Sequence, residues 1–260
     1  MNKDESKAVG SCLNNVNKKI MVMSGKGGVG KSSVSLNLAA TLARNGFRVG
    51  ILDVDFHGPS IPVMLGLQQT SLMTNGEKVI PAEVKGIKVM SIAFLLEGKN
   101  DAVIWRGPRK SAILNSMLED VDWGELDYLI MDFPPGTGDE AMTACQTVAD
   151  ADGGIVVTTP QEVSLSDCRR AISFCDKMNL PVIGVIENMA GFACPSCNKI
   201  YDIFRSGGGK ALSEESGVPF LGSLPLDPRM AESCDKGEIF IEMYPDSKVA
   251  VAFSEIIERL

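Results

Sequence analysis

The sequence of 260 residues predicts a three-layer α/β fold, in which helices flank both faces of a central, mostly parallel and twisted sheet. Three observations predict it. Segments with apolar residues at helical spacing alternate with short apolar runs, and this alternation indicates βαβ units. A first apolar run, residues 20–23, leads into a glycine-rich segment and then into a helical pattern. Later apolar runs of buried-strand type each end in a polar residue, at Asp53, Asp132, Thr158 and Glu187.

The chain is long enough to bury a substantial core, and no low-complexity linker interrupts the pattern. We therefore expect a single domain over residues 18–260. Residues 1–17 are polar and patternless, which predicts a flexible N-terminal arm. Residues 79–96 predict a short β-rich excursion, and residues 246–260 predict a helix that packs on the core.

The glycine-rich segment has the context of a phosphate-binding loop, because it follows a predicted strand and opens a predicted helix. In such a loop, backbone N–H groups cradle the phosphates of a nucleoside triphosphate. Lys31 is expected to reach the β- and γ-phosphates and Ser32 to hold Mg²⁺. The predicted nucleotide-binding residues are Gly25, Lys26, Gly27, Gly28, Val29, Gly30, Lys31, Ser32 and Ser33.

Two carboxylates close the next strand. Asp53 and Asp55 follow an apolar run at the carboxyl edge of the sheet, where ligands of open α/β folds bind. Both side chains are expected on one face, near the metal and the phosphates. Asp55 is our candidate for positioning the attacking water. The alternative is that these carboxylates cap the helix that follows Gly58-Pro59-Ser60.

A second apolar strand ends at Asp132 and continues into a Pro-Pro-Gly-Thr-Gly segment, residues 134–138. This pattern is typical of a Walker B strand followed by a switch II loop. Asp132 is expected to organise Mg²⁺ through water, while the loop senses the γ-phosphate and transmits its loss. The alternative is a simple turn in which Asp139 caps the next helix.

Cys194 and Cys197 lie in a proline-containing turn, and their spacing allows both thiolates to bind one metal or one cluster. A closed site normally needs four thiolates, so one chain supplies half of it. Zinc, an iron–sulfur cluster and a redox disulfide all remain open from the residues alone. Of the other cysteines, Cys234 is an open candidate for an accessory ligand or reactive thiol, whereas three are expected in the core: Cys145, Cys168 and Cys175.

The phosphate-binding segment resembles the deviant Walker A motif of the MinD, ParA and nitrogenase-iron-protein class, because Lys26 adds a second lysine to it. In that class the extra lysine reaches across a dimer interface to the partner's nucleotide. The resemblance therefore implies a homodimer in which Lys26 and Lys31 both balance γ-phosphate charge. A two-fold axis then supplies Cys194 and Cys197 from each copy, which makes four ligands for one bridging centre.

Most of the chain resembles the Mrp/ApbC/Nbp-type iron–sulfur cluster carrier ATPases of this class. The resemblance rests on the strings Asp53–Pro62, Trp105-Arg106-Gly107-Pro108, Asp132–Asp139 and Glu187-Asn188-Met189 before the cysteine pair. It implies a weak ATPase that transfers a labile 4Fe-4S cluster, bound by Cys194 and Cys197 across the dimer, to apo-proteins. It also implies that Asn188 and the backbone around Pro225 hold adenine. The N-terminal arm has only Cys12, so the second cluster of the eukaryotic long form is expected to be absent.

The alternative function is a positioning or partition switch ATPase of the MinD/ParA kind, with a structural zinc at the cysteine pair. A membrane-targeting helix has a Lys/Arg-rich polar face, whereas residues 246–260 mix acidic and basic side chains. The net charge of −8 argues against nucleic acid or an anionic membrane as the main partner. No apolar run reaches about 18 residues and no signal-peptide pattern is present, so we expect a cytoplasmic protein.

Overall fold

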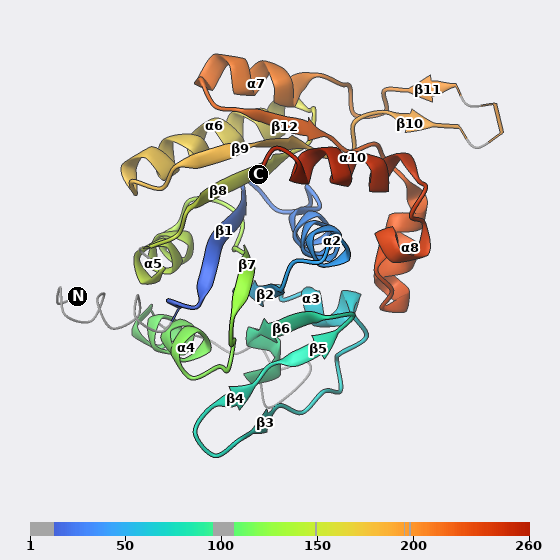
Figure 1. The fold of residues 1–260 in the computed structure, drawn as a ribbon. Helices are drawn as coiled ribbons and strands as arrows, with labels where there is room; N and C mark the ends of the chain where they lie inside the picture. Colours follow the sequence, from blue (N-terminus) through green and yellow to red (C-terminus); the bar gives the residue numbers. More distant parts are fainter. Residues whose placement is uncertain (1–12, 96–106, 149, 195, 198) are drawn as a thin grey trace.

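An eight-stranded sheet forms the centre of the computed structural model, which describes residues 13–95, 107–148, 150–194, 196–197 and 199–260 (Figure 1). The strand order is β12-β9-β8-β1-β7-β2-β6-β5, and only the edge pair β5 and β6 is antiparallel. The strands are β1 (Val16–Ser24), β2 (Val49–Asp53), β5 (Ala82–Val84), β6 (Ile87–Ser91), β7 (Leu126–Asp132), β8 (Gly153–Thr158), β9 (Val182–Glu187) and β12 (Phe220–Ser223). The predicted fold class is confirmed.

The four apolar runs end where the sequence predicted. β2, β7, β8 and β9 end at Asp53, Asp132, Thr158 and Glu187. At the N-terminus, β1 begins at Val16, two residues before the predicted start of the domain, and Leu13 is buried beneath it. The remainder of the predicted arm, residues 1–12 with Cys12, lies outside the described residues.

Helices cover both faces of the sheet, because its strands expose apolar side chains alternately to each side. In β1, Ile20 and Val22 join one core with α2, α9 and α10, while Met21 and Met23 join the opposite core with α4, α5 and α6. The helices are α2 (Lys31–Arg44), α3 (Ile61–Met64), α4 (Gly107–Glu119), α5 (Asp139–Thr147), α6 (Glu162–Lys177), α7 (Gly208–Ser216), α8 (Pro228–Lys236), α9 (Phe240–Met243) and α10 (Lys248–Ile257).

The β-rich excursion predicted over residues 79–96 is present in its described part. β6 extends the parallel sheet beside β2, and β5 turns back antiparallel at the edge. A separate hairpin pairs β3 (Met73–Thr74) with β4 (Val79–Ile80), and a 3-10 helix follows β6 at Ile92–Leu95.

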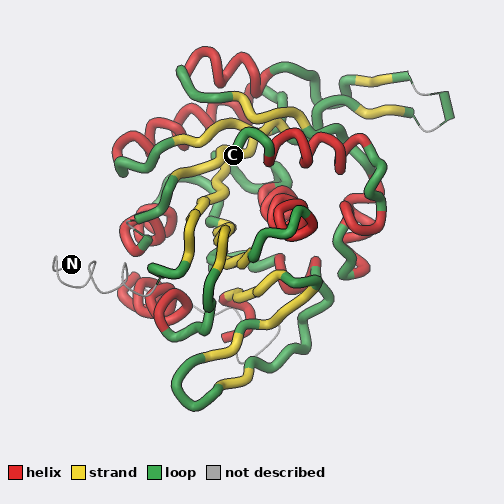
Figure 2. The backbone as a smooth tube through the Cα atoms, viewed as in Figure 1, coloured by secondary structure: helices red, strands yellow, loops and turns green. Residues whose placement is uncertain are grey.

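The last helix and a hairpin over residues 192–201 differ in whether they pack on the core. α10 packs on the core through Val249, Ala250, Phe253 and Ile256, as the sequence predicted. A hairpin of β10 (Phe192–Ala193) and β11 (Ile200–Tyr201) instead projects away from the sheet and helices (Figures 1 and 2). Within the described ranges, no helix has the length and apolar character that crossing a bilayer requires.

Candidate nucleotide and metal site

The predicted phosphate-binding loop lines a cavity of about 240 Å³ at the carboxyl edge of the sheet. The loop leaves β1 at Ser24 and enters α2 at Lys31, so the N-terminal amides of a 14-residue helix face this cavity. Free N–H groups and the helix dipole together favour an anion at such a position. The lining residues are Ser24, Lys26, Gly27, Gly28, Gly30, Lys31, Ser32, Ser33, Asp55, Gly58, Ser60, Met64 and Pro135.

Asn188 braces this loop from the end of β9. Its side-chain amide donates to the carbonyl of Val29 at 2.9 Å. The adjacent Gly30 has a φ of 80°, and a Cβ there would lie 2.4 Å from Asn188 Nδ2. Only glycine therefore suits this position, for its backbone conformation and for the close approach of the amide. The structure brings Asn188 and the phosphate loop together, across 159 residues of sequence.

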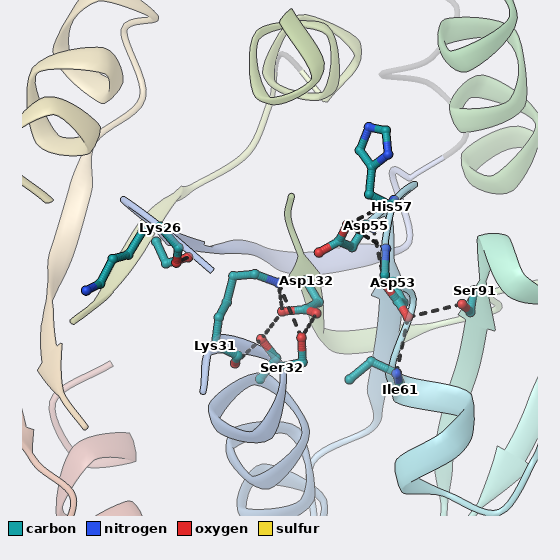
Figure 3. Close-up of polar contacts among 12 residues, drawn as sticks. Lys26, Lys31, Ser32, Asp53, Asp55, His57, Ile61, Ser91 and Asp132 are labelled. Carbon is teal, nitrogen blue, oxygen red and sulfur yellow. Dashed lines mark hydrogen bonds and ion pairs between the residues drawn. The ribbon is translucent and has the colours of Figure 1, made fainter. Parts of the chain in front are cut away.

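Buried Lys31 and Asp132 and half-buried Ser32 form one polar cluster (Figure 3). Lys31 Nζ lies 2.7 Å from Asp132 Oδ1, and Ser32 Oγ donates to Asp132 Oδ2 at 2.5 Å. Ser35, which the sequence analysis missed, donates its hydroxyl to Asp132 Oδ1 at 2.7 Å. A serine one helical turn after Lys31 was the available signal, because it lies on the same face of α2. The cluster joins the predicted Walker A and Walker B residues.

The aspartate that ends β2, Asp53, differs from Asp55 just after it, which corrects the expectation that both approach the phosphates. Asp55 lines the cavity, whereas Asp53 is fully buried and does not. Asp53 Oδ2 accepts from the backbone N–H of Ile61, the first residue of α3, and from the Ser91 hydroxyl. The alternative of helix capping is therefore correct for Asp53. Burial, and then the neighbouring Asp132 charge, raise the pKa of the Asp53 carboxyl.

Lys26 has a different orientation from Lys31. Figure 3 shows its side chain extending away from Asp132, while that of Lys31 extends toward it. Lys26 makes no ion pair with any residue in the described ranges, although it lines the cavity. His57 extends away from the phosphate loop, and its Nε2 lies 2.5 Å from Glu140 Oε1. Sequence reasoning missed Glu140, because no local pattern links residues 83 positions apart.

Pro225 lies in the segment that joins β12 to α8, and this segment runs beside the end of β9. Leu224 N–H donates to the Glu187 carbonyl at 2.8 Å, and Ala190 N–H donates to the Leu224 carbonyl at 2.9 Å. Leu226 N–H then donates to the Gly191 carbonyl at 2.8 Å. The residues expected around adenine, Asn188 and Pro225, therefore belong to two backbone segments that are hydrogen-bonded together.

The segment after β9 continues directly into the hairpin that carries the cysteine pair. Cys194 N–H donates to the Lys199 carbonyl at 3.0 Å, so the turn between β10 and β11 is closed by a backbone hydrogen bond. Cys197 is exposed and Cys194 is half-buried. Hydrogen bonds from the backbone N–H groups of Ser196 and Cys197 lower the pKa of the Cys194 thiol. A thiol that ionises readily is suited to binding a metal.

The described part of the chain supplies the pair with no further ligand. Among those residues, no group of three or more His, Cys, Asp or Glu side chains is arranged to hold a metal ion. The remaining described cysteines lie elsewhere. Burial raises the pKa values of the Cys145, Cys168 and Cys175 thiols, as expected for core residues. Cys234 Sγ lies 3.9 Å from Ser33 Oγ, beside the phosphate loop and away from the hairpin.

Comparison with protein families gives a match over nearly the whole chain. A family model described as ParA, NUBPL iron-transfer P-loop NTPase, matches residues 15–260. An iron-sulfur cluster carrier protein from Methanocaldococcus jannaschii is 49% identical over 249 residues, which cover 95% of this chain and 85% of that protein. A cytosolic Fe-S cluster assembly factor NUBP2 homolog from Trichoplax adhaerens is 48% identical, over 93% of each chain.

Solved structures give the same fold. A nucleotide-binding protein from Archaeoglobus fulgidus, in complex with ADP, has a TM-score of 0.79 and 38% identity, and the match covers 90% of this chain and 92% of that one. The septum site-determining protein MinD from Pyrococcus horikoshii, complexed with Mg-ADP, has a TM-score of 0.68 at 23% identity, over 93% of this chain and 94% of that one. The MinD likeness extends to the fold alone.

Proposed function

This chain belongs to the family of NUBPL-type iron-transfer P-loop NTPases, and from that membership we propose an ATP-hydrolysing carrier of iron–sulfur clusters. The cargo is a 4Fe-4S cluster, held between two copies of the chain and transferred to apo-proteins. The names of the relatives, an iron-sulfur cluster carrier and a cytosolic Fe-S cluster assembly factor, support this cargo and a cytoplasmic location. The ADP-bound neighbour at 38% identity supports an adenine nucleotide.

Hydrolysis requires water to attack the γ-phosphorus and ADP to leave with phosphate as the second product. We assign Lys31 and Lys26 to the phosphate charge and Asp55 to the orientation of the water. Ser32 and Asp132 supply hydroxyl and carboxylate oxygens, the ligand type that Mg²⁺ prefers, and they lie together at the loop. Mg²⁺ held by these two residues would supply positive charge to offset that of the nucleotide's phosphates.

The single observation that carries the cluster assignment is the position of the cysteine pair. Cys194 and Cys197 lie on a projecting hairpin, and the described residues add no third ligand. A four-thiolate centre therefore needs a second copy, and a two-fold axis through the hairpins supplies it. Ile200 and Tyr201 on the same hairpin, and Ile203 just after it, are exposed large apolar side chains, which favours burial against a partner surface.

The connection between the two sites supports a role for ATP in cluster transfer. The hairpin begins at Phe192, directly after the residues that pair with Leu224 and Leu226. Asn188, four residues before the hairpin, donates to the phosphate loop. Nucleotide binding at the loop is thus linked to the base of the cysteine hairpin by consecutive hydrogen-bonded segments.

The test is anaerobic reconstitution of the full chain and of a Cys194→Ala/Cys197→Ala variant, followed by iron, sulfide and zinc analysis. Wild type is expected to hold about four irons and four sulfides per dimer. The double variant is expected to lose them and to keep its nucleotide affinity, because the two thiols lie outside the phosphate-loop cavity.

Transfer is then measured by incubating the loaded wild type with an apo-ferredoxin and following the recipient's absorption. Iron retained in the double variant contradicts the shared site. Stoichiometric zinc that resists exchange would instead indicate that the cysteine pair is a structural zinc site. It would favour the alternative function, a switch ATPase.

A further inference from the structure

The loop that follows Asp55 is attached on its outer side to two helices. His57 Nε2 lies 2.5 Å from Glu140 Oε1, on the first turn of α5. Lys110 Nζ of α4 forms an ion pair with the same Glu140 oxygen and lies 5.5 Å from the centre of the Phe56 ring. Two consecutive loop residues are therefore contacted by side chains from α4 and α5, and these side chains also contact each other.

The inner side of this loop carries the Asp55 carboxylate. Asp55 Oδ1 accepts from the backbone N–H groups of His57 and Gly58, each at 3.2 Å. These donors fix the carboxylate beside the cavity that it lines. The position of Asp55 therefore depends on the position of the His57 backbone, and the His57 side chain is attached to α5.

Glu140 is well suited to accept a hydrogen bond from the His57 side chain. Its burial favours the neutral acid, but hydrogen bonds from Lys110 and His57 outweigh that effect and lower the pKa of the carboxyl. A charged acceptor makes a stronger hydrogen bond than a neutral one. The His57 side chain is 73% exposed, so the contact with Glu140, rather than burial in the core, orients the ring.

We propose that Glu140 is a positioning residue for ATP hydrolysis, which acts through His57 to hold Asp55 where it orients the attacking water. This inference rests on the proposed function, in which Asp55 has that task. α5 begins at Asp139, directly after the 134–138 segment assigned to γ-phosphate sensing. Glu140 thus links the start of α5, which follows the loop after β7, to the loop after β2.

The test compares Glu140→Ala, His57→Ala and the double variant as full-length protein, with kcat, KM and nucleotide dissociation constants measured for each. Each single change is expected to lower kcat about tenfold, because a small misplacement of a catalytic group is costly. Nucleotide affinity is expected to stay within about twofold of wild type, since neither side chain lines the cavity. The double variant is expected to be no slower than the slower single variant, because both changes break one link.

A matched control is Glu215→Ala, which removes a helical glutamate from an ion pair with Arg169, away from the nucleotide site. Its kcat is expected to equal that of wild type. Multiplied losses in the double variant, unchanged kcat in either single variant, or weaker nucleotide binding at unchanged kcat would each overturn the positioning role. His57→Ala changes an exposed side chain, so the comparison holds even if Glu140→Ala folds poorly.

The Lys31→Ala variant distinguishes failure of the positioning role from failure of the proposed ATPase function on which that role rests. Lys31 is assigned to the phosphates, so its loss is expected to abolish turnover. If Lys31→Ala is inactive and Glu140→Ala is fully active, the ATPase assignment stands and the positioning role fails. If Lys31→Ala turns over at the wild-type rate, the proposed ATPase site itself is wrong.

Discussion

At the scale of single residues, access to the cavity and hydrogen-bond partners distinguish two buried aspartates that lie close together in the sequence. Asp53 and Asp55 are two residues apart, yet of the two only Asp55 lines the cavity. Asp53 accepts hydrogen bonds from the backbone N–H groups of Asp55 and Ile61 and from the Ser91 hydroxyl. Its task is to join the end of β2 to the start of α3 and to β6, and so to shape the loop that holds Asp55.

The raised pKa of Asp53 predicts a specific dependence of stability on pH. Above the ordinary carboxyl value of about 4, the unfolded chain has lost the Asp53 proton and the folded chain still holds it. The free energy of unfolding therefore decreases as pH rises through that window, by up to about 1.4 kcal/mol per pH unit for one full proton. Asp53→Asn removes this contribution.

Urea unfolding of wild type and Asp53→Asn from pH 4 upward measures the contribution of Asp53 to the pH dependence of the free energy of unfolding. The wild-type free energy of unfolding is expected to fall more steeply with pH than that of the variant, while all other titrating groups are shared. Parallel curves would show that Asp53 ionises in the folded protein near its ordinary pKa.

At the scale of elements, α8 contacts both the phosphate-loop helix α2 and the segment around α3. Met230 Sδ accepts from the Asn37 side-chain amide of α2 at 3.4 Å. At the other end of α8, Gly237 lies against Gly66, which follows α3. Both glycines have positive φ, of 72° and 68°, but their surroundings differ. A Cβ at Gly237 would lie 2.7 Å from Gly66 N, whereas a Cβ at Gly66 meets nothing closer than 3.9 Å.

This asymmetry predicts different effects for two similar substitutions. Gly66→Ala is expected to lower the free energy of unfolding by about 1 kcal/mol, from the left-handed backbone alone. Gly237→Ala adds a backbone clash that forces α8 and α3 apart, and about 2–3 kcal/mol is expected. Gly217→Ala is a second control, because its φ is 67° and its Cβ would meet nothing within 4 Å. Equal losses in chemical denaturation of all three variants would contradict the packing argument.

At the scale of the whole molecule, the incomplete cysteine site and the orientation of Lys26 point to the same proposal of a homodimer. The hairpin carries two of the four thiolates that a closed centre requires. Lys26 extends away from Asp132, which already forms an ion pair with Lys31. A second copy gives both features a partner, and symmetry requires that each copy contribute equally.

Dimerisation is therefore expected to depend on Lys26 when ATP is bound. Analytical ultracentrifugation of wild type with ATP and Mg²⁺ is expected to show a dimer, and Lys26→Ala is expected to weaken it about tenfold or more, because it removes a charged contact from each of the two symmetry-related copies. Lys248→Ala, on α10 away from the cavity, is the matched control. A dimer of unchanged strength in Lys26→Ala would remove the lysine from the interface.

The sequence by itself determined the strand ends and the phosphate loop. Apolar runs must be buried, and their period and length distinguish strands from helices, so the ends of β2, β7, β8 and β9 were predictable. The phosphate-binding loop was predictable because its glycines, Lys31 and Ser32 are contiguous in sequence between a strand and a helix. The cysteine pair was recognisable as a candidate site because its two thiols are close in sequence.

Only the tertiary structure decided which polar side chains meet. Asp53 and Asp55 differ because one lies inside the sheet edge and the other faces the cavity, which depends on how α3 packs against β2. The contact of His57 with Glu140, 83 residues later, is set by α5 lying beside the loop after β2. Such contacts join segments that are far apart in the sequence. The identity of a side chain does not specify which distant residue it will contact in the folded protein.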